Sequence, residues 1–129
     1  MIAAKSLISV VDDDESVRES LPDMLRKFGF AAEVFSSAED FLASEHLDQT
    51  RCLVLDVAMP GMSGPDLQAE LHDRALAIPI VFITANGDAA TRPRLMQDGA
   101  VECLFKPFSL TALRDAVHAA LRRTSRDPS

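Results

Sequence analysis

The sequence predicts a single α/β domain of the doubly wound class, in which helices cover both faces of a parallel β-sheet. Its 129 residues match the size of one domain, commonly about 100–150 residues. Five short apolar runs alternate with five segments of helical periodicity, and this alternation is typical of parallel sheets with right-handed crossovers. The runs are apolar without alternation, which indicates strands buried on both faces.

The five apolar runs are the expected strands. The second run is more polar than the others, so we expect it at an edge of the sheet. In chain order the runs are Leu7–Val11, Ala31–Phe35, Cys52–Leu55, Ile78–Ile83 and Val101–Phe105.

The first two helices are predicted from apolar spacing and capping residues. Leu21 and Leu25 belong to an apolar stripe at helical spacing, and Gly29 follows as a typical C-cap. Pro22 lies beside that stripe, and we expect it to kink the first helix rather than end it. Ser37 is a suitable N-cap for the second helix.

The other three helices also have recognisable ends. Residues 64–66 (Gly-Pro-Asp) open the third helix with proline at its first position. Pro93 delays the fourth helix, which we expect to begin near Arg92 and to end at Gly99. Ser109 caps the fifth helix.

Composition and charge exclude several classes of protein. With 47% hydrophobic and 26% charged residues, the chain is not disordered. Its net charge of −7 repels nucleic-acid phosphates, so we expect no direct nucleic-acid binding. The apolar runs are too short to span a membrane, and the first residues lack a signal-peptide core. Cys52 and Cys103 lack metal or redox spacing and are expected to be reduced, buried thiols in the cytoplasm.

Polar side chains follow four of the predicted strands, at the points where those strands end. Asp12 and Asp13 follow the first strand, Asp56 the third, Thr84 the fourth and Lys106 the fifth. Ligands of doubly wound sheets bind beyond the carboxyl ends of the strands. We therefore expect these five side chains to form one site.

Three carboxylates at one edge of a sheet need a cation. Asp12, Asp13 and Asp56 arrive directly from buried strands, and an unpaired buried carboxylate costs several kcal/mol or takes up a proton. A hard divalent ion with oxygen ligands removes that cost, so we expect Mg²⁺, with Mn²⁺ as an alternative. Asp14 and Glu15, which come next, fit the N-terminus of a helix instead.

The same edge does not suit a nucleotide or a flavin. The loop after the first strand is acidic and has no glycine, whereas phosphate-binding loops are rich in Gly, Ser or Thr. A metal, Lys106 and the Thr84 hydroxyl around Asp56 describe a place where a phosphoryl group is transferred to that carboxylate. A phosphatase with an aspartate nucleophile usually has a second acid where Ala58 stands, which disfavours an enzyme acting on a free substrate.

Four blocks stand in order at the predicted strand ends: Val10–Glu15, Leu55–Gly64, Ile83–Ala85 and Phe105–Phe108. Together they resemble the signatures of bacterial response-regulator receiver domains, most closely those of FixJ-like transcription regulators. The resemblance covers about residues 5–124 and implies a flavodoxin-like (βα)5 sandwich with strand order 2-1-3-4-5. We expect residues 1–124 to be the receiver domain and residues 125–129 a tail or the start of a linker.

The resemblance also implies individual roles. Asp56 would accept a phosphoryl group from the phosphohistidine of a histidine kinase. Asp13 would bind Mg²⁺ directly, Asp12 would bind it through water, and the backbone carbonyl of Ala58 would complete the protein ligands.

Lys106 and Thr84 would contact the phosphoryl oxygens, and the Lys106–Pro107 peptide would be cis. The implied partners are a sensor histidine kinase or phosphotransfer protein and, after phosphorylation, a second copy of the chain. That copy would bind through the fourth helix, fifth strand and fifth helix, the surface that switches. In the implied strand order Cys52 and Cys103 are too far apart for a disulfide.

Three functions follow as alternatives. The first is a phosphorylatable receiver that controls transcription through an output domain or a separate partner. The second is a standalone phosphate sink or adaptor, and the third a degenerate receiver used only for protein binding, which the complete acid, threonine and lysine positions disfavour. Cys103 stands where the family usually has an aromatic residue, so we expect altered coupling to the switching surface. Ala58 and Asn86 occupy variable positions that set the lifetime of the phosphoryl group.

Overall fold

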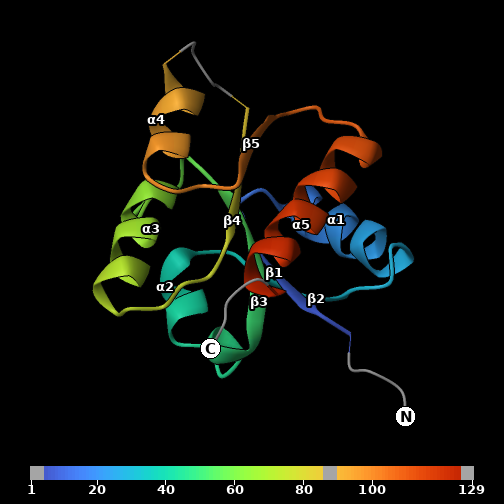
Figure 1. The fold of residues 1–129 in the computed structure, drawn as a ribbon, viewed down its shortest axis with the longest axis horizontal. Coiled ribbons are helices and arrows are strands. Elements are labelled where there is room, and N and C mark those ends of the chain that lie inside the picture. The colour runs from blue at the N-terminus through green and yellow to red at the C-terminus, as the bar shows by residue number, and fades with distance from the viewer. Residues whose placement is uncertain (1–4, 86–89, 126–129) are drawn as a thin grey trace.

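The computed structural model describes residues 5–85 and 90–125. Its five strands form one parallel sheet of order β2-β1-β3-β4-β5, with helices on both faces (Figure 1). This confirms the predicted doubly wound, flavodoxin-like order 2-1-3-4-5. The strands are β1 Leu7–Val11, β2 Ala31–Phe35, β3 Thr50–Asp56, β4 Ile80–Thr84 and β5 Glu102–Phe105. The helices are α1 Glu15–Lys27, α2 Ala38–Leu42, the 3-10 turn η1 Leu47–Gln49, α3 Gly64–Asp73, α4 Thr91–Gln97 and α5 Leu110–Ser125.

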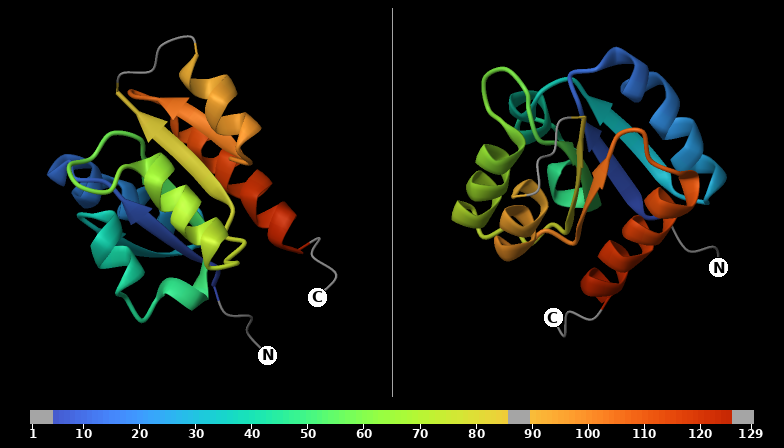
Figure 2. Two further views of the ribbon diagram at one scale, coloured as in Figure 1. Left: turned by 90° about the vertical axis from the view of Figure 1, so that its left-hand side faces the viewer. Right: turned by 90° about the horizontal axis from the view of Figure 1, so that it is seen from above.

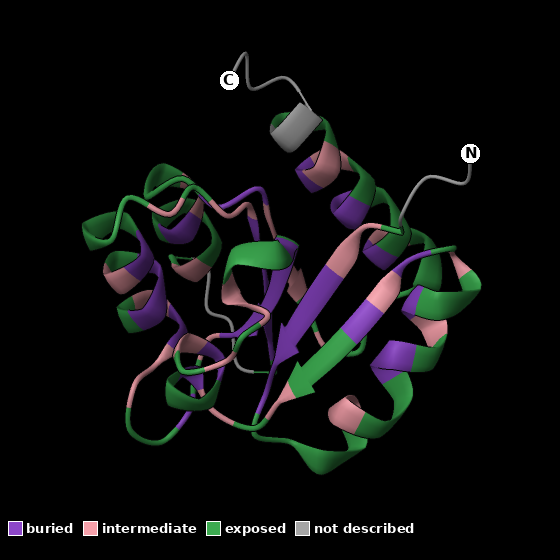
Figure 3. Ribbon diagram, turned by 90° about the horizontal axis from the view of Figure 1, so that it is seen from below, coloured by how far each residue is buried: buried purple, intermediate pink, exposed green. Residues whose placement is uncertain are grey.

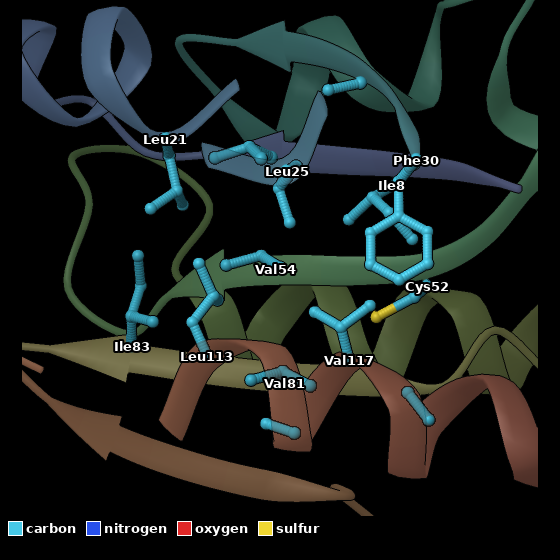
Figure 4. Packing of buried hydrophobic residues seen from close by; sticks show 14 of the residues in the cluster. Ile8, Leu21, Leu25, Phe30, Cys52, Val54, Val81, Ile83, Leu113 and Val117 are labelled. Atoms are coloured by element: carbon cyan, nitrogen blue, oxygen red, sulfur yellow. The ribbon is translucent and has the colours of Figure 1, made fainter. Parts of the chain in front are cut away.

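Helices α1 and α5 cover one face of the sheet, and α2, α3 and α4 cover the other (Figures 1 and 2). Neighbouring strand residues point to opposite faces, so the sheet has a separate apolar core on each side. The α1/α5 core contains Ile8, Leu25, Val54, Leu113 and Val117 among others (Figure 4). The α2/α3/α4 core contains Phe41, Leu53, Leu67, Phe82 and Leu95 among others.

Burial follows the predicted division between central and edge strands. Every residue of β4 is buried, whereas β2 at the edge exposes Glu33 and Val34 (Figure 3). The more polar composition of β2 is therefore explained by its position. At the other end of the sheet, β5 exposes Phe105.

The predicted helix ends are confirmed by their hydrogen bonds. Ser37 accepts the backbone N–H of Asp40, and Ser109 accepts that of Ala112. Helix α3 opens at the predicted Gly-Pro-Asp segment, but Gly64 is its first residue and Pro65 its second. Its reciprocal capping box between Ser63 and Asp66 was not predicted. The C-terminal glycines of α1 and α4 both have positive φ angles of about 100° (97° and 106°), a conformation that closes a helix at little cost only for glycine.

The two helix prolines act differently, as predicted. Helix α1 continues through Pro22, as predicted. Pro22 was expected beside the apolar stripe, but it is buried together with Leu21 and Leu25. The buried face of α1 is therefore wider than the spacing of its leucines indicates. The kink at Pro22 stays a prediction. Helix α4 begins at Thr91, one residue from the expected start near Arg92. Residues 86–89 of the preceding loop, to which the expectation for Asn86 refers, lie outside the described residues.

The two cysteines occupy different cores. Cys52 belongs to the α1/α5 core and Cys103 to the α2/α3/α4 core, and both thiols are free and buried. They are separated by β4 as well as by the thickness of the sheet, which confirms that they are not placed for a disulfide. The Lys106–Pro107 peptide is cis, as the resemblance implied.

Candidate functional site at the carboxyl edge of the sheet

The carboxyl edge of the sheet brings together most of the side chains predicted for the site. Asp12 follows β1, Asp56 ends β3, Thr84 ends β4 and Lys106 follows β5. Asp12 is fully buried, and Asp56 and Thr84 are only 6% and 3% exposed. Parallel strands end at one edge, so residues up to 94 positions apart in the chain meet here.

Lys106 places an ammonium group against the acids of this edge. Its Nζ donates a hydrogen bond to Oδ2 of Asp12 at 2.9 Å and lies 3.9 Å from Oδ1 of Asp56. Desolvation lowers the pKa of Lys106, but the hydrogen bond and the negative charge of Asp12, followed by the charges of Asp56 and Asp14, raise it overall. The ammonium therefore stays charged beside the two carboxylates.

The turn after β1 is built by Asp12 and Asp14. Asp12 Oδ1 accepts the backbone N–H of Asp14, and the Asp12 carbonyl accepts a hydrogen bond from Arg18. Asp14 in turn caps α1 by accepting the backbone N–H and hydroxyl of Ser16, hydrogen bonds that lower the pKa of Asp14. This is the helix N-terminus predicted for Asp14, and it leaves Asp12, Asp13 and Asp56 as the acids that face one another.

Those three acids have the geometry of a cation site. One carboxylate oxygen from each of Asp12, Asp13 and Asp56 lies within 4.8 Å of the others, with Asp13 exposed and the other two buried. Desolvation and the charge of Asp12 raise the pKa of Asp56 to about 7, against the opposing effect of Lys106. A set of carboxylate oxygens that repel one another when ionised fits a hard divalent cation such as Mg²⁺.

The loop from β3 to α3 (residues 57–63, the β3–α3 loop) begins directly after Asp56 of this cluster. Its exposed second residue is Ala58, whose carbonyl was predicted as a ligand. Gly64 lies against Asp56 so closely that an added Cβ would collide with the Asp56 carbonyl oxygen. This glycine therefore lets the start of α3 pack onto the end of β3.

Some residues around the site were not predicted. Arg18 and Glu39 both hydrogen-bond backbone groups near the acids, Glu39 by accepting from Met62. No local pattern in the sequence distinguishes them from other surface charges, because each contact depends on how distant elements pack.

The predicted switching surface has its own ion pair. Arg92 at the start of α4 donates twice to Oε1 of Glu102 in β5, at 3.0 and 2.6 Å. The same oxygen accepts the backbone N–H of Cys103, which is 3% exposed and pairs with Phe82 of β4. A small, buried thiol thus occupies the position at which the family resemblance leads us to expect an aromatic residue.

No helix in the part of the chain that the structure describes is both long and apolar enough to cross a membrane.

Comparison with known proteins gives a consistent answer. The response regulator receiver domain model matches residues 8–118. Nodulation protein W of Bradyrhizobium diazoefficiens is 46% identical over 121 residues, which are 94% of this chain and 53% of that protein. The transcriptional regulatory protein FixJ of Rhizobium meliloti is 41% identical over 113 residues, 88% of this chain and 55% of that protein. The chain thus spans about half the length of these curated relatives.

Solved structures agree with the sequence comparison. The response regulator StyR superposes with a TM-score of 0.85 at 49% identity, covering 96% of this chain and 65% of that one. The structure of FixJ-N gives a TM-score of 0.81 at 39% identity, covering 95% and 96%. With the matched family model, the strand order and the acid cluster at the strand ends, these likenesses show that the chain belongs to the response regulator receiver domain family.

Proposed function

We propose that this chain receives a phosphoryl group on Asp56 from the phosphohistidine of a sensor histidine kinase or a phosphotransfer protein. The observation that supports this most is the surroundings of the Asp56 carboxylate. It is 6% exposed at the end of β3, 3.9 Å from the ammonium of Lys106 and within reach of two further acids. An oxygen nucleophile beside a fixed cation and a cation-binding cluster suits phosphoryl transfer.

In the proposed reaction an oxygen of the Asp56 carboxylate attacks phosphorus. The P–O bond forms while the P–N bond of the phosphohistidine breaks, and its electron pair returns to the imidazole nitrogen. Lys106 is positioned to neutralise charge on the transferred group, and the Thr84 hydroxyl at the end of β4 to donate to it. Mg²⁺ or Mn²⁺, when bound by Asp13, Asp56, the Ala58 carbonyl and, through water, Asp12, supplies further charge neutralisation.

The proposed consequence is a change in the surface formed by α4, β5 and α5. This change would control transcription through an output domain, and residues 125–129 would be a tail or the start of a linker following a receiver domain of residues 1–124. The proposal is supported by relatives named as transcriptional regulators, of which this chain spans about half. Homodimerisation through the same surface, a cytoplasmic location and the absence of direct nucleic-acid binding belong to this proposal, the last because the net charge is −7.

Phosphorylation of the purified chain tests the central step. Incubation with acetyl phosphate and Mg²⁺ should add one phosphoryl group, and mass spectrometry should map it to Asp56. Asp56→Asn should abolish labelling, whereas Asp48→Asn, which changes an exposed acid of η1, should leave it unchanged. Label that persists in Asp56→Asn contradicts the assignment, and a parent chain that takes no label favours the degenerate, protein-binding alternative.

A further inference from the structure

Helix α2 makes a contact with the β3–α3 loop that the proposed reaction does not use. Glu39, in the first turn of α2, accepts a hydrogen bond from the backbone N–H of Met62, with 3.2 Å between Oε2 and the nitrogen. Gly61, the preceding residue, has a φ angle of 74°, which glycine adopts readily. A Cβ on Gly61 would lie 2.9 Å from Glu39 Oε2, so the missing side chain lets the carboxylate reach the loop.

The rest of the loop shows why this contact matters. Its two ends are fixed by backbone hydrogen bonds, from Val57 to Ile83 at 3.0 Å and from Gly64 to Val57 at 2.9 Å. Between them, Met59 is buried and Glu39 reaches the chain from 23 positions away. Among the described residues, Glu39 provides the side-chain hydrogen bond by which a distant element holds the middle of the loop.

Glu39 is itself presented by a well-anchored turn. Ser37 caps α2, and the neighbouring Ala38 and Phe41 are fully buried in the α2/α3/α4 core. Phe41 also packs edge to face against Phe35 of β2, with ring centroids 5.4 Å apart. A carboxylate held on a fixed element constrains its backbone partner more than a freely moving one does.

We infer that Glu39 is a positioning residue, which fixes the middle of the β3–α3 loop and thereby the direction of the Ala58 carbonyl relative to Asp12, Asp13 and Asp56. The inference rests on the proposed function, because the Ala58 carbonyl matters only when the acid cluster holds a divalent ion. A carboxylate that accepts a backbone N–H forms a charge-assisted hydrogen bond, which is stronger than a neutral one. Its loss releases the loop without touching any proposed ligand.

The first test measures binding of Mg²⁺ alone, by titration of the isotopically labelled chain followed in amide NMR spectra. We expect Glu39→Ala to weaken Mg²⁺ binding about three- to tenfold. Glu39→Gln, which keeps an oxygen acceptor, should stay within about twofold of the parent. Glu45→Ala is the matched control, since it removes an exposed acid just beyond α2 and should leave the affinity unchanged.

Two further measurements separate the contact from a general loss of stability. In metal-free protein, the Met62 amide should exchange with solvent about tenfold faster in Glu39→Ala than in the parent. Gly61→Ala should weaken Mg²⁺ binding in the parent, and by a smaller factor in the Glu39→Ala background, because the clash with the carboxylate is gone and only the strain at positive φ remains.

The outcomes that overturn the inference are distinct from those that overturn the proposed function. A Glu39→Ala protein with parental Mg²⁺ affinity refutes the positioning role, whatever its amide exchange. Equal effects of Gly61→Ala in both backgrounds also refute it. A parent chain that neither binds Mg²⁺ nor takes a phosphoryl group refutes the proposed function instead.

Discussion

Strand β3 begins and ends with a buried polar residue, and the two have opposite surroundings. Thr50 and Asp56 are both 6% exposed. The Thr50 hydroxyl shares a hydrogen bond of 2.7 Å with the hydroxyl of Ser9 and donates one of 2.9 Å to the His46 carbonyl. At the other end of the strand, Asp56 faces other carboxylates, and its pKa is raised to about 7.

Thr50 and Asp56 thus separate a buried polar group that stabilises the fold from one that belongs to the candidate site. At Thr50 neutral donors and acceptors satisfy one another, so burial costs little. At Asp56 like charges are held together although one carboxyl must then retain its proton near neutral pH. Natural proteins keep such an arrangement mainly at functional sites, where a ligand or a reaction compensates for its cost.

The largest expected effect is a stabilisation by Asp56→Asn in metal-free protein. The folded carboxyl keeps its proton up to about pH 7, whereas an unfolded one loses it near pH 4. The folded state therefore binds more protons between these values, and the free energy of unfolding of the parent falls as pH rises from about 4 to 7. One unit of raised pKa costs the ionised folded state about 1.4 kcal/mol, so at pH 8 with a chelator Asp56→Asn should be more stable than the parent by about 2–4 kcal/mol.

Denaturant unfolding at a series of pH values measures this effect. The fall in stability between pH 4 and 7 should flatten in Asp56→Asn, while Asp48→Asn serves as a control that keeps the parental profile. A variant that is less stable than the parent at pH 8 without metal would contradict the raised pKa.

The opposite result is expected at the start of the strand. Thr50→Val leaves the Ser9 hydroxyl and the His46 carbonyl without their shared partner, so we expect a loss of about 1–2 kcal/mol. Thr50→Ser keeps the hydroxyl and should lose less. The loss should be the same at pH 5 and pH 8, and a pronounced pH dependence would show that the two ends of β3 are not independent.

Addition of Mg²⁺ should stabilise the protein through the acids around Asp56 and not through Thr50 at the other end of β3. At millimolar Mg²⁺ and pH 8 the parent should gain about 1 kcal/mol by mass action, and Thr50→Val should gain as much. Asp13→Asn and Asp56→Asn should gain less, because each removes a carboxylate oxygen proposed as a ligand. Thermal unfolding with and without the metal distinguishes these cases, and an Asp13→Asn chain with the full gain would remove Asp13 from the ligands.

The smallest expected effect concerns how far a change at Asp56 is transmitted. Cys103 is packed in β5 opposite Phe82 and is much smaller than the aromatic ring that the resemblance leads one to expect. Amide shifts induced in α4 and α5 by beryllofluoride, a phosphoryl mimic, should be larger in Cys103→Tyr than in the parent. Cys103→Ala, which adds no ring, is the control, and equal shifts in all three chains would leave the aromatic residue without a role.

Much of this molecule follows from local sequence. The buried strands predict a parallel sheet, and a parallel sheet brings Asp12, Asp56, Thr84 and Lys106 to one edge without further information. The strand bounds are less predictable: β3 extends over Thr50 and Asp56, because backbone pairing continues where the side chains become polar. Interactions between distant elements, such as that of Glu39 with Met62, are set by packing and leave no periodic pattern.

The two cysteines make the opposing helical layers separately observable. Burial raises the pKa of the Cys52 thiol to about 12 and also raises that of Cys103, so neither reacts with a thiol reagent while it is covered. Cys52 belongs with Phe30 and Val117 to the α1/α5 core (Figure 4), and Cys103 belongs to the α2/α3/α4 core. In two variants that each retain one of the two cysteines, the rate at which a thiol reagent labels that cysteine would report how often its side of the sheet opens in the native state.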